Sequence, residues 1–364
     1  ASAGTVPVGC QIIAVYRGRL VLAGSPTDPQ QWFMSKLLDP TNWDYSATGD
    51  DRAVSGTNSR AGKIGAPITA LCPFTDLCLV MAARTSLWIL RGDPVTGHMD
   101  NLSHEIGIID KNAWCTTASG DMVFLSHDGV YSVPANCTAG RPMSISREVL
   151  PDELLNIDPN IYTVNLAYDV KDRGVHIFLS PNYAEYESQH WFLDWEPRSE
   201  MRAFFRVELG STEFNPFSVC HRRDVTSDQS TVMLGGDDGY VRYFDSDAED
   251  DDGEVFDSAT YYGPILPAGD NEELTIRQIS GKLDALSGPV QWQVLAGDSA
   301  EEAVEATPSK TGRISTGGKV IWSQVNLTAG AFYIRLEART PGSAWAIEKL
   351  IIGIYRSSCG ACSR

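Results

Sequence analysis

Two stretches of the sequence have spacings that could support metal chemistry. Cys359-Gly-Ala-Cys362 has the gap of half a zinc site or of a redox pair, but no second Cys or His pair lies near it. Asp245-Ser-Asp-Ala-Glu-Asp-Asp-Asp-Gly253 alternates carboxylates before a glycine, as a calcium loop does, but Phe256 occupies the place of the bidentate glutamate. We therefore interpret the spacing of the two cysteines near the C-terminus as a chance match, and the acidic run as a solvated loop.

The other chemistry-bearing residues form no recognisable catalytic set. The sequence lacks a His-Glu-x-x-His pair, a Gly-x-Ser-x-Gly elbow and a phosphate-binding glycine loop. Ser126-His-Asp-Gly129 is one residue too short for the repeated Ser-x-Asp-x-Gly turn of sialidase-type propellers. Paired carboxylates for glycoside cleavage cannot be chosen by spacing among 47 acidic residues. The sequence therefore predicts no catalytic, cofactor-binding or metal-binding residues. Six histidines, without metal-ligand spacing, are expected in ordinary packed or surface roles: His98, His104, His127, His176, His190 and His221.

Charge and composition exclude several classes of protein. The formal net charge is -18 at pH 7, which disfavours a protein that grips nucleic acid by its phosphates. The acidic charge fits either an ordinary soluble surface or a surface over which DNA passes without sticking. No apolar run reaches the roughly 20 residues that span a bilayer, and residues 1–5 do not resemble a signal peptide. Four cysteines fall inside apolar strand-like runs and are expected to be free, small hydrophobic residues: Cys72, Cys78, Cys115 and Cys220.

One unit of strand-like sequence recurs five times between residues 11 and 244. Each copy has short apolar runs separated by turn residues, and Asp128-Gly129 supplies the positive φ of a tight hairpin. The copies align on one apolar residue of the middle run, at intervals of 59, 44, 54 and 55 residues: Leu22, Met81, Leu125, Leu179 and Leu234. Such a repeat is typical of β-propeller blades. We predict a β-propeller over residues 1–267, with five visible blades or six if residues 254–266 complete another; a large β-sandwich is the alternative.

The character of the sequence changes after residue 268. From Leu274 the runs alternate polar and apolar residues and are joined by Gly, Pro and Ser turns. This pattern predicts a small jelly-roll-like β-sandwich over residues 268–356, with residues 300–318 as a polar excursion. Residues 357–364 are expected to form a C-terminal tail.

Three phrases of the first half resemble tail proteins of short-tailed bacteriophages. They are Tyr16-Arg-Gly-Arg-Leu-Val-Leu-Ala23 with the following Asp39-Pro-Thr-Asn-Trp-Asp44, residues 65–91, and residues 105–129. The resemblance is to the virion propeller proteins known as tail nozzle, tail hub or tail tube needle-base proteins. It covers residues 10–135 well and the later copies only in pattern. It implies one subunit of a ring, commonly a hexamer, below the portal and adaptor, and no catalytic site.

We therefore expect a structural, non-enzymatic virion protein without cofactors, made in the host cytoplasm. Its expected partners are copies of itself in a ring around the DNA exit channel and other tail, adaptor or portal proteins, with DNA passing without specific binding. The alternative is a host-surface propeller that binds or cleaves carbohydrate. Large apolar residues expected at loop tips would form the partner surface: Trp32, Phe33, Trp43, Tyr45, Tyr183, Tyr186, Phe214 and Phe217. Asp50-Asp51 and the run from Asp245 to Asp252 are the candidates for an acidic lumen.

Overall fold

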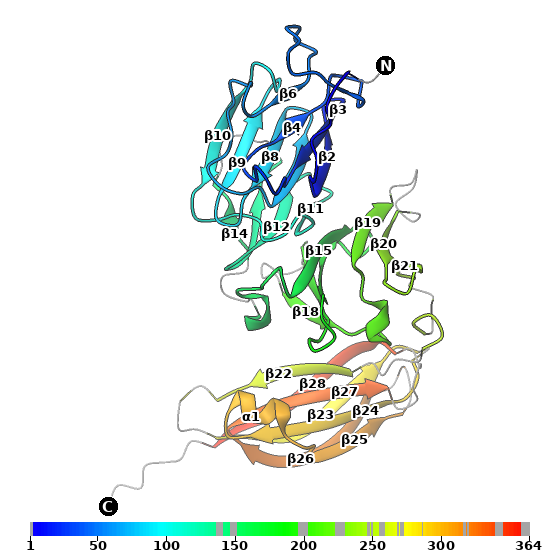
Figure 1. Cartoon of the computed structure of the whole chain (residues 1–364). Coiled ribbons are helices and arrows are strands. Elements are labelled where there is room, and N and C mark those ends of the chain that lie inside the picture. The colour runs from blue at the N-terminus through cyan, green and yellow to red at the C-terminus, as the bar shows by residue number, and fades with distance from the viewer. Residues whose placement is uncertain are drawn as a thin grey trace, which may run out of the picture. The chain divides into compact units, whose positions relative to one another are not determined.

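The protein is built almost entirely from small antiparallel β-sheets (Figure 1). The computed structural model describes residues 3–135, 141–145, 151–195, 203–222, 230–245, 248, 250–254, 259–267, 269, 273–285, 287–315, 318, 320–338 and 345–357. Within these ranges, no helix has the length and apolar character needed to cross a membrane. The all-β class expected from the sequence is therefore confirmed.

The chain divides into two compact units. The first comprises residues 1–208 and 212–244, and the second comprises residues 209–211 and 245–364. The sequence placed the boundary near residue 268, because residues 254–266 could have completed a sixth blade. Instead β22 (Ala259–Ile265) pairs with β27 (Ala331–Ala338) in the second unit. These residues join the sandwich because Tyr262 and Ile265 pack on its core.

In the described residues, the first unit holds five sheets of three or four strands and one two-stranded sheet, and each larger sheet joins its strands in chain order. The strands are β2 (Ile12–Tyr16), β3 (Arg19–Ala23), β4 (Phe33–Met34) and β6 (Val54–Ser55) in the first sheet; β7 (Ala70–Thr75), β8 (Cys78–Ala82), β9 (Leu87–Arg91) and β10 (His98–Ser103) in the second; β11 (Trp114–Thr116), β12 (Met122–Ser126), β13 (Gly129–Val133) and β14 (Met143–Ser144) in the third; β15 (Tyr162–Asp169), β16 (Gly174–Pro181), β17 (Gln189–Asp194) and β18 (Phe204–Val207) in the fourth; and β19 (Ser218–Arg222), β20 (Thr231–Gly235) and β21 (Val241–Tyr243) in the fifth. Outside these sheets, β1 (Ala3–Gly4) pairs in parallel with β5 (Asn42–Trp43), and η1 (Asp152–Leu154) and η2 (Thr212–Phe214) are single 3₁₀ turns.

Each copy of the repeated unit forms one of these sheets. The five residues on which the copies align all lie in the second strand of their sheet and are buried: Leu22, Met81, Leu125, Leu179 and Leu234. The predicted hairpin at Asp128-Gly129 joins β12 to β13, and Gly129 has a φ of 140°. Strand β10 was missed, because the polar sequence His98–Ser103 has the composition of a loop.

Successive sheets share apolar cores. One core joins the first and second sheets, a larger one joins the second, third and fourth, and a small one joins the fourth and fifth. The first strands of the sheets also contact one another, β2 with β7, β11 with β15, and β15 with β19. The first strands of three of the four pairs of successive sheets therefore lie against each other.

A buried arginine holds the long excursion between β4 and β6. The Arg19 guanidinium donates to the backbone oxygens of Ser35 (2.9 Å) and Asp50 (3.0 Å), and also to that of Arg52. The excursion therefore closes over the sheet.

Two tryptophans of this region were expected at exposed loop tips, and this was wrong. Trp32 and Trp43 are 0% and 1% exposed, and their indole N–H groups donate to backbone oxygens of Gly62 and Pro40. Indoles buried with a satisfied N–H stabilise the excursion instead of marking a partner surface.

The second unit is a sandwich of two antiparallel sheets around one core. Its sheets have the orders β22-β27-β24-β25 and β26-β23-β28. The elements not yet given are β23 (Glu273–Leu283), β24 (Val290–Gly297), α1 (Ala300–Glu305), β25 (Lys310–Ile314), β26 (Val320–Ala329) and β28 (Ile347–Ser357). The polar excursion expected over residues 300–318 contains two elements that the sequence analysis did not predict, α1 and β25. Ser299 caps α1 by accepting a hydrogen bond from the Glu302 N–H (3.2 Å), as an N-cap serine does.

Candidate functional site

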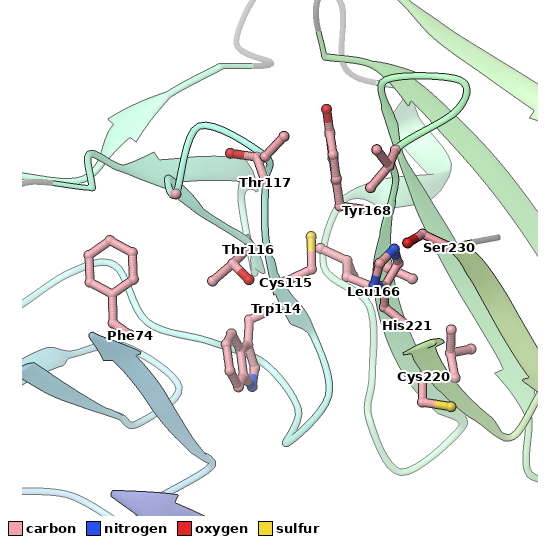
Figure 2. Close-up of a pocket in the computed structure, with 15 residues that line it drawn as sticks. Phe74, Trp114, Cys115, Thr116, Thr117, Leu166, Tyr168, Cys220, His221 and Ser230 are labelled. Carbon is pink, nitrogen blue, oxygen red and sulfur yellow. The ribbon is translucent and has the colours of Figure 1, made fainter. Parts of the chain in front are cut away.

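A cavity of about 650 Å³ lies where the first strands of four sheets approach one another. Figure 2 shows Phe74 and Trp114 on one side of it, and Tyr168 and His221 on the other. These residues come from β7, β11, β15 and β19, so the cavity is the hub of the first unit. Its volume is in the range of small-molecule sites, and its lining combines aromatic and aliphatic side chains with hydroxyl groups of Thr and Ser.

The hub cavity is lined by uncharged groups apart from one titratable histidine, His221. The described lining residues include no Asp, Glu, Lys or Arg. Trp114 is fixed, because its indole N–H donates to the Lys111 carbonyl (3.1 Å). Burial raises the pKa of the Cys115 thiol, so the thiol stays protonated and is a poor nucleophile at neutral pH. The described lining can hold an uncharged ligand against aromatic rings.

The two terminal sheets of the array each expose an apolar face. On the first sheet, Ile13 and Val15 of β2 are 66% and 63% exposed, while Ile12 and Tyr16 on the other face pack into the core. Leu38 lies beside the β2–β3 turn and donates its N–H to the Gly18 carbonyl. We call Ile13, Val15 and the exposed Leu37 and Leu38 the first-sheet face.

The fifth sheet repeats this arrangement at the other end of the array. Val232 and Leu234 of β20 point into the core shared with the fourth sheet. On β21, Val241 and Tyr243 are 64% and 58% exposed. Tyr243 is paired in register with Met233 of β20, which is itself paired with Cys220 of β19. We call Cys220, Met233, Val241 and Tyr243 the last-sheet face.

The other predicted surface aromatics have mixed positions. Tyr183 and Tyr186 are exposed in the β16–β17 loop, as expected. Phe33, Tyr45, Phe214 and Phe217 are half-buried. The partner surface expected from loop aromatics therefore reduces to few residues, and the exposed apolar strand positions were not singled out from the sequence.

The candidate acidic loops have local structural roles in the described residues. The Asp51 carboxylate pairs with Lys36 at 3.0 Å, on the surface. In the run from Asp245 to Asp252, residues 246, 247 and 249 lie outside the described residues. Asp251 accepts a hydrogen bond from the Gly210 N–H (2.6 Å), and Asp250 accepts one from the Gly253 N–H (2.9 Å). Within the described part of the chain no cluster of three His, Cys, Asp or Glu residues has the geometry to hold a metal ion.

The predicted roles of the cysteines hold in part. Cys72, Cys78 and Cys115 are free and buried in strands, as expected, whereas Cys220 is free but exposed. The pair Cys359 and Cys362 lies outside the described residues. Cys220 belongs to the outer side of β19, which the apolar run around it could not reveal.

Two histidines that spacing did not connect lie in direct contact. Nδ1 of His176 on β16 is 2.8 Å from Nε2 of His190 on β17, and both rings are buried. The strands place Phe192 opposite His176 and Phe178 opposite His190, so the two imidazoles meet on a diagonal. The sequence signal was one histidine in each of two apolar runs, without the register that joins them.

Comparison with known proteins does not assign the chain to a family. No family model and no curated protein matches it. Among solved structures, a glycoside hydrolase family 43 arabinoxylan arabinofuranohydrolase from Bacillus subtilis, in complex with cellotetraose, is similar with 9% identity and a TM-score of 0.29, over 94% of each chain. The extracellular domain of a one-component system from B. thetaiotaomicron has 13% identity and a TM-score of 0.25, over 66% of this chain and 40% of that one. Likenesses at these TM-scores carry no argument about fold or activity.

Proposed function

We propose that this chain is a structural, non-enzymatic subunit that joins copies of itself head to tail into a ring. The observation that carries the proposal is the pair of exposed apolar faces on the first and fifth sheets. Contiguous exposed apolar residues on a folded protein mark interaction sites. The two faces differ in composition and lie on different sheets, so a contact between them is heterologous, and heterologous contacts that close give rings.

The same faces bear on the finer architecture of the first unit. Five consecutive blade-like sheets, with first strands in contact in three of the four successive pairs, support an arrangement of propeller type. In a propeller closed within one chain, the first and fifth sheets would cover each other. Here the first-sheet face and the last-sheet face are both exposed, so a neighbouring copy can supply the missing cover. For the second unit, the jelly-roll type stays a prediction beside the observed two-sheet sandwich.

The proposed location of this ring, in a phage tail, depends on the sequence resemblance to tail proteins of short-tailed phages. In that setting the ring belongs to the tail nozzle or hub, surrounds the DNA exit channel and contacts other tail, adaptor or portal proteins. Six-fold symmetry follows from the resemblance alone. A net charge of -18 is compatible with DNA passing without binding. Detection of the chain in purified particles, and its symmetry in a whole-particle map, test this setting.

The head-to-tail contact is tested with one charge in each face. Val15→Glu and Tyr243→Glu are each expected to abolish higher oligomers in sedimentation velocity. An equimolar mixture of the two variants retains one intact pair of faces, so it is expected to form dimers and nothing larger. Leu77→Glu, on an exposed apolar residue outside both faces, is the matched control and should assemble as the wild type does.

Three outcomes would overturn the head-to-tail contact. The first is a wild-type chain that stays monomeric at all concentrations. The second is a loss of folding stability in each glutamate variant without any change of oligomeric state, which would mean closure within one chain. The third is a mixture of the two variants that stays monomeric although each variant is folded.

The hub cavity favours a second candidate function, binding of an uncharged saccharide. Trp114, Phe74 and Tyr168 offer aromatic surface, and Thr116 adds a hydroxyl. The candidate concerns binding, because the described lining residues offer aromatic and hydroxyl groups and no carboxylate. A glycan array with the wild type and Trp114→Ala tests this candidate: saturable binding that the variant loses would support it, and an array without signal would exclude it.

A further inference from the structure

The contact between His176 and His190 lies in the junction of the fourth and fifth sheets. The two residues are 5% and 2% exposed. Phe244, which follows β21, stacks on the His176 ring at 4.7 Å and 12°. Phe178 stacks on the His190 ring at 4.2 Å and 23°. The imidazole pair is therefore enclosed between aromatic rings that belong to both sheets.

The hydrogen-bond pattern indicates where the protons of the neutral pair lie. Asp169 Oδ2 is 3.9 Å from His176 Nε2, too far for a hydrogen bond but close enough to favour a proton on that nitrogen. His176 Nδ1 is then the acceptor, and His190 Nε2 donates to it at 2.8 Å. This leaves His190 Nδ1 as a buried ring nitrogen without a hydrogen-bond partner in the described residues.

A proton placed on His190 therefore goes to a costly position. On His190 Nδ1 it would create a buried imidazolium, and burial first and the neighbouring His176 second hold the pKa of His190 well below its usual value. Burial by itself would raise the pKa of the Asp169 carboxyl. The His176 side chain and the N–H groups of Asp172 and Lys171 outweigh burial, so the pKa of Asp169 is lowered and the carboxyl stays charged.

The fifth sheet brings further charged or titratable groups to this junction. Arg242 of β21 is paired in register with Leu234, which faces the junction, and its guanidinium is 2.6 Å from Asp238. His221 of β19 is paired in register with Val232 in the same way. On the side of the fourth sheet, β18 places the apolar Val207 opposite His190. The Arg242 charge is paired with Asp238, so burial and His176 are the causes that oppose a proton on His190.

We propose that the His176–His190 pair is an acid-sensitive latch that holds the fifth sheet, through Phe244, against the fourth. In the closed state His190 is neutral. Opening the junction exposes the ring to water, where it can accept a proton at its ordinary pKa. This inference does not depend on the proposed assembly, because it concerns the interior of one chain.

The sign of the pH effect follows from proton linkage. An exposed histidine has a pKa of about 6.5, so above that pH the closed and open junctions bind the same number of protons and the latch is fully effective. Below about pH 6.5 only the open junction takes up the proton on His190. Each further unit of acid therefore favours opening roughly tenfold, until the depressed pKa of the closed state is reached.

Hydrogen exchange at two pH values tests the latch. The opening constant of β19 and β20 amides, corrected for intrinsic exchange, is expected to rise about tenfold between pH 7.5 and pH 5.5. Amides of β8, in the second sheet, serve as the internal reference and should not change in this way. In His190→Gln, which keeps a donor toward His176 but cannot be protonated, the rise should disappear. His98→Gln, at an exposed histidine on β10, should behave as the wild type.

Either of two results would overturn the latch. One is a wild-type opening constant of the fifth sheet that does not respond to acid, and the other is a His190→Gln variant that responds as the wild type does. If His190→Gln fails to fold, the wild-type His190 resonance decides in an NMR pH titration. If the His190 resonance titrates at an ordinary histidine pKa while the amides of the fifth sheet stay protected from exchange, the proposal is refuted. If His190 becomes protonated only as those amides lose their protection, the proposal is supported.

Discussion

Replacing Arg19 tests how the long excursion of the first sheet is held in place. Arg19 is 1% exposed, and its guanidinium donates hydrogen bonds to the backbone oxygens of Ser35 (2.9 Å) and Asp50 (3.0 Å) and to that of Arg52. Burial lowers the pKa of the guanidinium, so these oxygens compensate for the lost hydration of its charge. Hydrogen bonds to charged groups contribute about 1.5–3 kcal/mol each, and removing one side of a buried charged contact costs about 3–5 kcal/mol.

We expect Arg19→Met to lower the free energy of unfolding of the first unit by about 3–5 kcal/mol, because it leaves three carbonyl groups without their donor. Arg19→Lys should recover only part of this loss, since an ammonium group cannot present the planar fork of the guanidinium. Arg60→Met, at an exposed arginine shortly after β6, is the control and should change stability by less than about 0.5 kcal/mol.

Urea denaturation followed by tryptophan fluorescence measures the effect of Arg19, and hydrogen exchange over residues 36–55 locates it. The largest increase in exchange should fall in that segment. A loss below about 1 kcal/mol for Arg19→Met, with unchanged exchange there, would refute the reasoning and mean that packing alone holds the excursion.

Two further predictions concern single contacts. Gly174→Ala should lower the melting temperature with a loss of about 1–3 kcal/mol, because its Cβ would lie 1.9 Å from the Phe192 ring, whereas Gly65→Ala, with open space around it, should be neutral; equal effects would contradict the clash. Asp51→Asn breaks a surface ion pair with Lys36 and should cost less than about 1 kcal/mol in a thermal melt. If that aspartate lines a DNA channel, the same variant should slow genome ejection from particles, and a wild-type ejection rate would exclude it from the lumen.

The repeated part of the fold was predictable because its signal is carried by buried apolar residues. Leu125 and Leu179 could be aligned without a structure, since a second strand packed on both faces reads as a continuous apolar run. Outer strands such as β10 are half-exposed and polar, so composition alone assigns them to loops. The short helix α1 did carry a signal, because Ser299 and Glu302 have the spacing of a capping box.

The boundary and the functional surfaces were harder to predict, for a different physical reason. Strand β22 resembles a further repeat locally, and only its pairing with β27 assigns it to the sandwich. Likewise His176 and His190 meet because of the register of β16 and β17, which the intervening loop leaves undetermined in the sequence. The exposed residues Val15 and Tyr243 look like core residues in a one-dimensional pattern. Local sequence patterns therefore do not show which distant segments pair with each other or in which register.

The route of the backbone between the two units has a mechanical consequence. Residues 209–211 belong to the second unit, the next residues return to form the fifth sheet, and the chain enters the second unit again at Asp245. The Gly210 N–H donates a hydrogen bond to Asp251, so the two segments of the chain that enter the second unit are joined to each other there. The chain therefore crosses between the two units at three points, 208–209, 211–212 and 244–245, and the last two crossings flank the fifth sheet. Both ends of the fifth-sheet segment are joined covalently to the second unit, so tension applied to the sandwich reaches this sheet from both ends.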